Sequence, residues 1–250
     1  MRTRTGYGVF GIVLALTSHI SLAAIKPAEN VATYLKHGKA ALARGNPEQA
    51  IEDFGRAIVL DPNSADAYLH RGSARQALND VNGAVEDFNH AIELDPRCFG
   101  AYINRGNLRQ QADDFTGAMA DYEQALKIDG KSARGHYNRG LLLMVMNDVD
   151  RAIDDFNRAI QIDPGYALAY NNRGVALQHK GNLEQALADL DRAVALDRRH
   201  ATAYMNRGLV RLKLGRKAQA EQDFAKAVAL APELRDVVER SQEVTALEQR

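Results

Sequence analysis

The chain has 250 residues and carries 32 Lys plus Arg against 32 Asp plus Glu, so its formal net charge is zero. A balanced chain lacks the basic field with which proteins attract nucleic acid or acidic membranes, and neither is expected as a partner. Cys98 is the only cysteine, which excludes an intrachain disulfide and a four-cysteine metal site.

The first 23 residues have the composition of a secretory signal peptide. Arg2 and Arg4 precede an apolar stretch at 9–16, and small residues at 21 and 23 occupy the two positions that a signal peptidase reads. The apolar stretch is shorter than the roughly 20 residues of a membrane-spanning helix. We therefore expect cleavage after Ala23, export to a bacterial periplasm or secretion, and no stable membrane span in the mature chain. An anchor that stays uncleaved is the alternative.

From residue 31 onward the sequence repeats itself every 34 residues. A fixed period between 20 and 50 residues is typical of stacked repeat proteins. The glycines that mark the period are Gly38, Gly72, Gly106, Gly140, Gly174 and Gly208. We number each repeat from position 1 to 34, and the repeats run 31–64, 65–98, 99–132, 133–166, 167–200 and 201–234. Residues 24–30 before them are expected to form a flexible segment.

Each repeat predicts two antiparallel helices, at about positions 1–14 and 18–30. Position 8 is glycine, and positions 20 and 27 are alanine in all six repeats, which lets two helices approach closely. Position 4 is tyrosine in five repeats and position 24 is aromatic in five, and these rings fill the space beside the small residues. Residues 235–250 are polar with one narrow apolar stripe, which predicts a capping helix at the end of the stack.

This pattern resembles the tetratricopeptide repeat family over residues 31–234. The family's proline at position 32 is present as Pro62, Pro96, Pro164 and Pro232, whereas Gly130 and Arg198 replace it in repeats three and five. The resemblance implies an all-α fold, a right-handed α-solenoid of six helix-turn-helix repeats closed by a C-terminal capping helix. It also implies a role in binding other proteins.

One position departs from the family. Position 7, usually a buried leucine there, is arginine in repeats two to six, and position 23 is aspartate in every repeat. A desolvated charge without a partner is costly, so we predict that each arginine pairs with a position-23 aspartate. The alternative is a row of free guanidinium groups for an acidic partner.

The resemblance implies that positions 2, 5, 6, 9, 12 and 13 face a concave groove. Position 6 is His70 in repeat two and then asparagine four times, as Asn104, Asn138, Asn172 and Asn206. An amide offers a donor and an acceptor, the pair that holds a peptide bond without reading its side chain. With repeats roughly 10 Å apart, an extended peptide meets one amide about every three residues. The alternative is that these amides bond only to neighbouring repeats or to water.

Three further residues complete the predicted partner-binding site, namely Asn107 at position 9 and Tyr137 and Met205 at position 5. The predicted groove is polar in repeats one to three and more apolar in repeats four to six. Met144, Val145 and Met146 add adaptable apolar surface there, in part as core. The set of basic and amide residues that some family members use to clamp a carboxylate is incomplete.

No feature predicts an enzyme. The histidines have no metal-ligand spacing and the common hydrolase motifs do not occur, so neither a catalytic residue, a metal nor a cofactor is expected. The sequence therefore predicts a non-catalytic scaffold or adaptor that binds a protein or an extended peptide in its groove. The alternatives are a solenoid that self-associates and, as a third hypothesis, an envelope glycan-binding module centred on Tyr137.

Overall fold

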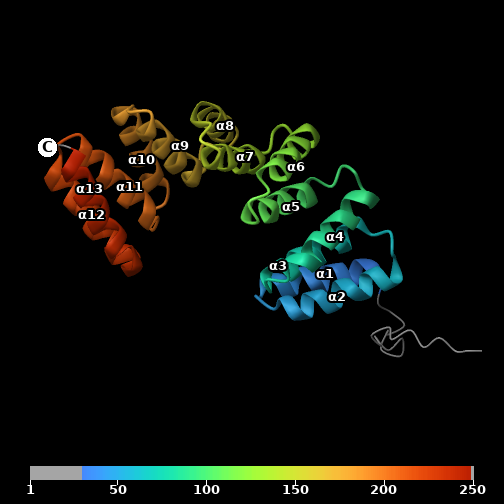
Figure 1. Cartoon of the computed structure of the whole chain (residues 1–250). Coiled ribbons are helices and arrows are strands. Elements are labelled where there is room, and N and C mark those ends of the chain that lie inside the picture. The colour runs from blue at the N-terminus through green and yellow to red at the C-terminus, as the bar shows by residue number, and fades with distance from the viewer. Residues whose placement is uncertain (1–29, 249–250) are drawn as a thin grey trace, which may run out of the picture.

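The computed structural model describes residues 30–248, with side chains described as far as Ser241, and this part of the chain is almost wholly helical (Figure 1). The helices are α1 (Val31–Ala43), α2 (Pro47–Leu60), α3 (Ala65–Ala77), α4 (Val81–Leu94), α5 (Phe99–Gln111), α6 (Phe115–Ile128), α7 (Ala133–Val145), α8 (Val149–Ile162), α9 (Ala167–His179), α10 (Leu183–Leu196), α11 (Ala201–Lys213), α12 (Lys217–Leu230) and α13 (Arg235–Glu248). A 3-10 turn, η2 (Pro232–Leu234), precedes α13. The predicted signal peptide and most of the predicted flexible segment lie outside the described residues.

The turn inside each repeat uses one residue of left-handed backbone. That residue stands at position 15, with φ between 58° and 81°, and is Gly45, Asn79, Asp113, Asn147, Gly181 or Gly215. Glycine, asparagine and aspartate are the residues that adopt this conformation at least cost. The next helix then begins after a polar cap in four repeats, where the side chain of Asn46, Asp80, Asp114 or Asp148 accepts from a backbone N–H three residues on. The helix pair is therefore encoded locally.

In five of the six repeats a glycine packs under an aromatic ring in the core. A Cβ placed on Gly140 would lie 2.7 Å from Cε1 of Phe156, whose side chain is fully buried. The same contact recurs at Gly38, Gly72, Gly106 and Gly208, and in repeat five Leu190 takes the place of the ring over Gly174. The alanines at positions 20 and 27 are also buried throughout. These small residues set the distance between the two helices of a pair.

The pairs stack one after another along a curved path, which is the predicted solenoid (Figure 1). Each helix packs on the helices before and after it, and each odd-numbered helix from α1 to α11 also contacts the next odd-numbered one. The even-numbered helices do not approach one another to the same degree. The odd-numbered helices therefore line the inner side of the curve, and the even-numbered helices form its outer side.

The last helix covers the end of the stack, as expected of a cap. α13 contacts α11, and Val238 is buried in a cluster with Ala220 and Phe224 of α12. An open groove remains on this end between α12 and α13, with a volume of about 510 Å³.

The close approach at Gly140 can be tested against a glycine that has room. Gly140→Ala should lower the free energy of unfolding by about 1–3 kcal/mol, because its Cβ would overlap Phe156. Gly55→Ala is the matched control, since a Cβ there meets nothing within 4 Å inside α2, and it should stabilise by about 0.5–1 kcal/mol. Urea unfolding followed by circular dichroism measures both. Equal midpoints for the two variants would contradict the packing described here.

Candidate functional site

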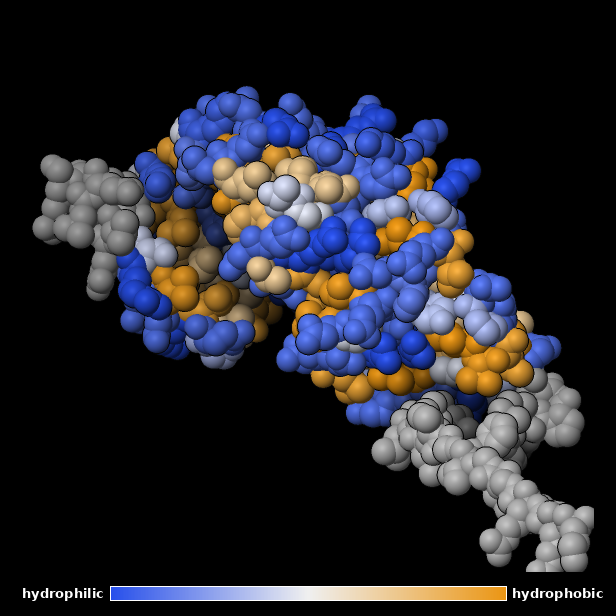
Figure 2. Space-filling view, turned by 45° about the vertical axis from the view of Figure 1, so that its right-hand side comes forward, coloured by the Kyte–Doolittle hydropathy of each residue, from blue (hydrophilic) through white to orange (hydrophobic). Residues whose placement is uncertain are grey.

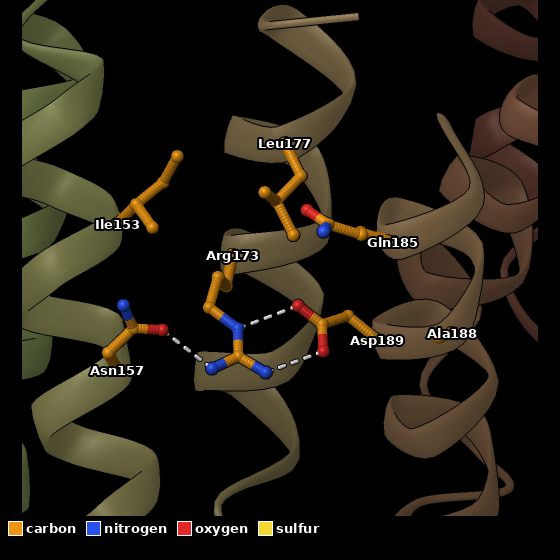
Figure 3. Close-up of a pocket in the computed structure, with 7 residues that line it drawn as sticks. All are labelled: Ile153, Asn157, Arg173, Leu177, Gln185, Ala188 and Asp189. Atoms are coloured by element: carbon orange, nitrogen blue, oxygen red, sulfur yellow. Dashed lines mark hydrogen bonds and ion pairs between the residues drawn. The ribbon is translucent and has the colours of Figure 1, made fainter. Parts of the chain in front are cut away.

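Arginine at position 7 and aspartate at position 23 form a two-pronged ion pair in each of repeats two to six. In repeat five, Nε of Arg173 donates to Oδ2 of Asp189 at 2.7 Å and Nη2 donates to Oδ1 at 2.6 Å (Figure 3). The other pairs are Arg71–Asp87, Arg105–Asp121, Arg139–Asp155 and Arg207–Asp223. All five aspartates are buried, so the predicted pairing is confirmed and these guanidinium groups are not a free basic row.

The same guanidinium groups also reach across the repeat boundary. Nη1 donates to position 25 of the preceding repeat in three cases, Arg105 to Asn89, Arg173 to Asn157 and Arg207 to Asp191, at 2.7 to 2.8 Å. Each of these arginines thus joins three helices, two of its own repeat and the second helix of the repeat before. A charged group held by three hydrogen bonds to two partners on different repeats constrains the angle between those repeats.

Repeat four holds its aspartate with a histidine as well. Nδ1 of His136 lies 3.0 Å from Oδ1 of Asp155, and Nε2 lies 3.2 Å from the carbonyl oxygen of Gly130. Burial alone would raise the pKa of the Asp155 carboxyl, but the hydrogen bonds from Arg139 and His136 outweigh it and the pKa lies below its usual value. His136 is therefore a second hydrogen-bonding partner of the buried Asp155 carboxylate, beside Arg139.

The asparagines predicted as a ladder lie in register on the odd-numbered helices, and their N–H groups bond to the preceding repeat. Nδ2 of Asn104 donates to Ser73 and that of Asn138 to Asn107, at 3.2 and 3.0 Å. Nδ2 of Asn172 donates to the hydroxyl of Tyr137 and that of Asn206 to Asn171, both at 2.9 Å. Bonding to neighbouring repeats, the alternative stated above, is thus present at all four positions.

The carbonyl oxygens of these amides differ between repeats. Oδ1 of Asn104 accepts from Arg134 at 2.7 Å and that of Asn172 from Asn171 at 3.2 Å. Within residues 30–241, Oδ1 of Asn138 and Oδ1 of Asn206 accept no hydrogen bond. Both side chains are half-buried. They are the acceptors that the ladder still offers to a ligand, one in repeat four and one in repeat six.

The remaining predicted groove residues are partly exposed and partly structural. His70 stacks on Phe54 at 5.6 Å and contacts Asp66, and burial lowers the pKa of its imidazole. The Tyr137 ring lies 4.9 Å from that of Tyr166, and burial is the main cause that raises the pKa of Tyr137 to about 12. Burial thus favours the neutral form of both side chains.

Asn107 and Met205 also contribute to the framework. Oδ1 of Asn107 accepts from the Tyr122 hydroxyl at 2.7 Å in addition to Asn138, and Met205 packs beside the Phe224 cluster. In repeat four, Met144 is partly buried and packs against the core, while Val145 and Met146 are 56% and 48% exposed.

The ion pairs that join neighbouring repeats at the surface were not predicted from the sequence. Lys39 pairs with Asp66 at 2.8 Å, Lys180 with Asp150, and Arg216 with Glu184 at 2.8 Å. The signal in the sequence was opposite charges separated by 27, 30 and 32 residues, slightly less than the 34-residue period. Among the residues that the structure describes, no three His, Cys, Asp or Glu side chains gather as metal ligands. None of the described helices has the length and apolar character that crossing a membrane requires.

Comparison with known families now identifies the architecture. Models of the tetratricopeptide repeat match residues 65–98, 133–166 and 171–234, and a model described as TPR repeat matches 38–79 and 106–147. The chain is a tetratricopeptide repeat (TPR) protein. TPR arrays present extended concave surfaces and generally act as protein–protein interaction modules without catalysis. The curated proteins contain no match to the chain.

Solved structures of TPR proteins share the fold. YrrB, described as a TPR protein with an unusual peptide-binding site, is 23% identical with a TM-score of 0.62, over 78% of this chain and 100% of YrrB. PilF of Pseudomonas aeruginosa is 20% identical with a TM-score of 0.71, over 87% and 97% of the two chains. MamA is 21% identical with a TM-score of 0.57, over 66% and 96%. At these identities the likeness concerns the fold alone.

The Arg–Asp pairing predicts a large cost when one partner is removed. Arg139→Ala should lower the free energy of unfolding by about 3 kcal/mol, because it leaves a buried carboxylate with His136 alone. Arg151→Ala in the same repeat is the control, since Arg151 pairs with Asp148 at the surface and should change stability by about 1 kcal/mol or less. Thermal and urea unfolding measure both variants. A stable Arg139→Ala chain would mean that the pair is not what holds the repeat.

Proposed function

We propose that this TPR protein is a non-catalytic scaffold that binds an extended segment of a partner protein along its inner face. The observation that supports it most is the mixed character of the odd-numbered helices in repeats four to six. Leu168 is 43% exposed at position 2, and Tyr137, Leu141, Val175 and Leu209 at positions 5 and 9 are each partly exposed. Oδ1 of Asn138 and Oδ1 of Asn206 are acceptors for peptide N–H groups among them.

The inner face thus combines apolar contact area with a few polar groups, the composition usual for a ligand site. A space-filling view shows a hollow with hydrophobic residues on its walls beside a mainly hydrophilic surface (Figure 2). The hydrogen bonds between repeats hold the inner wall before any ligand arrives, which lowers the ordering cost of binding. The peptide-binding site for which YrrB is described supports the same use of this fold.

Binding in the groove is tested with a peptide selected from a random display library against the full-length mature chain. Leu168→Asp should weaken that peptide by about tenfold or more, because burying a leucine contributes about 1.5–3 kcal/mol. The new carboxylate sits in the first turn of α9, where negative charge is tolerated, so the fold should be unaffected. Titration calorimetry measures affinity, and Lys226→Ala on the exposed surface of α12 is the control. Equal affinity in both variants would place the binding elsewhere.

We also propose that the protein is exported, which rests on the basic, apolar and small-residue order of residues 1–23 alone. Expression of the whole chain in a bacterium, followed by intact-mass measurement of the exported protein, should find a chain that begins at Ala24. Replacing Ala23 with a bulky residue should block that cleavage. A chain that keeps Met1 in the membrane fraction would support the uncleaved anchor instead.

A further inference from the structure

Every buried aspartate of repeats two to six except one has two basic side chains as partners. In three repeats an arginine at position 11 adds a second guanidinium to the carboxylate, at 2.9 to 3.0 Å, namely Arg75 on Asp87, Arg109 on Asp121 and Arg211 on Asp223. In repeat four the second partner of Asp155 is His136. In repeat five, among the described residues, Asp189 is paired with Arg173 only. Its side chain is also the most exposed of the five, at 10% against 1% to 7%.

The missing partner leaves a pocket. Position 11 of repeat five is Leu177, and beside it lies a pocket of about 380 Å³ on the outer side of the solenoid, between α8 and α10 and over α9 (Figure 3). Repeat four also has a leucine at this position, Leu143, but it is 1% exposed and packs in the core. Of the two leucines at position 11 in the described residues, Leu143 is thus packed over, whereas Leu177 borders an open pocket.

The walls of this pocket suit the side chain that fills the same place in the sister repeats. Ile153, Leu177 and Ala188 provide apolar surface for a methylene chain, and the Asp189 carboxylate lies beside them. Gln185 occupies position 19, the position whose backbone carbonyl accepts from Arg75 in repeat two and from Arg109 in repeat three, as Gly83 and Gly117. The pocket thus offers an arginine apolar walls and a carboxylate, with the residue at position 19 beside them as in the sister repeats.

The charge of Arg173 does not exclude a second guanidinium. Arg71 and Arg75 share the carboxylate of Asp87, and Arg207 and Arg211 share that of Asp223, with the first arginine in the same two-pronged geometry as Arg173. Asn157 further holds Arg173 through Nη1, which directs that nitrogen away from Asp189 (Figure 3). A planar guanidinium matches the remaining carboxylate edge better than an ammonium does.

We propose that this outer pocket of repeat five binds an arginine side chain presented by a partner polypeptide. It is a second interaction surface, on the opposite side of the solenoid from the concave groove, and it does not depend on what the groove binds. The occupant is supported by the chain's own precedents, in which an arginine takes this place three times.

The test uses N-acetyl-arginine amide as the probe and the side-chain amide resonances of Asn157 and Gln185 as the readout. Titration into the isotopically labelled full-length mature chain should shift both resonances in a saturable way. N-acetyl-citrulline amide, which has nearly the same shape without the charge, should shift them at least tenfold less at equal concentration. Equal shifts with the two probes, or none with either, would overturn the proposal.

Two variants exchange the sites between repeats. Leu177→Arg copies repeats two, three and six, so it should fill the pocket from within, keep the unfolding temperature at or above that of the parent, and abolish the probe-induced shifts. Arg211→Leu copies repeat five onto Asp223 and should create a second saturable site in repeat six. Probe binding that survives Leu177→Arg in a folded chain would contradict the assignment. A dimer in analytical ultracentrifugation that Leu177→Arg dissociates would instead give the pocket to a second copy of the chain.

Discussion

A carboxylate is buried in every repeat of this solenoid, and the rest of the structure is arranged to keep it paired. An isolated charge in that position would cost several kcal/mol, and the partner that prevents this is the arginine at position 7 in repeats two to six and Arg56 in repeat one. Its planar group binds both carboxylate oxygens and, in three repeats, an oxygen at position 25 of the preceding repeat. The buried carboxylate therefore explains both the integrity of each repeat and part of its attachment to the next.

On the inner face, neutral side chains connect neighbouring repeats as the arginines do on the outer side. Each asparagine at position 6 gives its N–H to the repeat before, so one polar row holds the stack from inside while the arginines hold it from outside. A donor used in this way is satisfied before a ligand arrives, which leaves recognition to the carbonyl oxygens and to the apolar side chains between them. The groups available for binding in the groove are thus those that do not already form hydrogen bonds between repeats.

Differences between repeats are informative because the six repeats have similar residues at most of their 34 positions. Position 4 is His136 where the others have tyrosine, and position 11 is Leu177 where three others have arginine on the aspartate. In repeat four, His136 contacts Asp155 and so supplies the second partner that the arginine at position 11 supplies in other repeats. In repeat five no such partner is present among the described residues, and a pocket remains open beside Asp189. Each repeat can therefore be compared with the others, and a pocket in one repeat can be recognised as the place that an arginine side chain occupies in its neighbours.

The amino-acid sequence by itself determined the repeat, the helix pairs to within one or two residues, the glycine under each ring and the Arg–Asp pairing, because these depend on short spacings that recur every 34 residues. It left open where the Asn104 and Asn172 amides point, and only the tertiary structure decided it. The first bonds to position 9 of the preceding repeat and the second to position 5, since small shifts between neighbouring helices select among acceptors that the period places equally near. The pocket beside Asp189 was hidden for the same reason, because an absent partner becomes visible only when three helices are placed around the space it would fill.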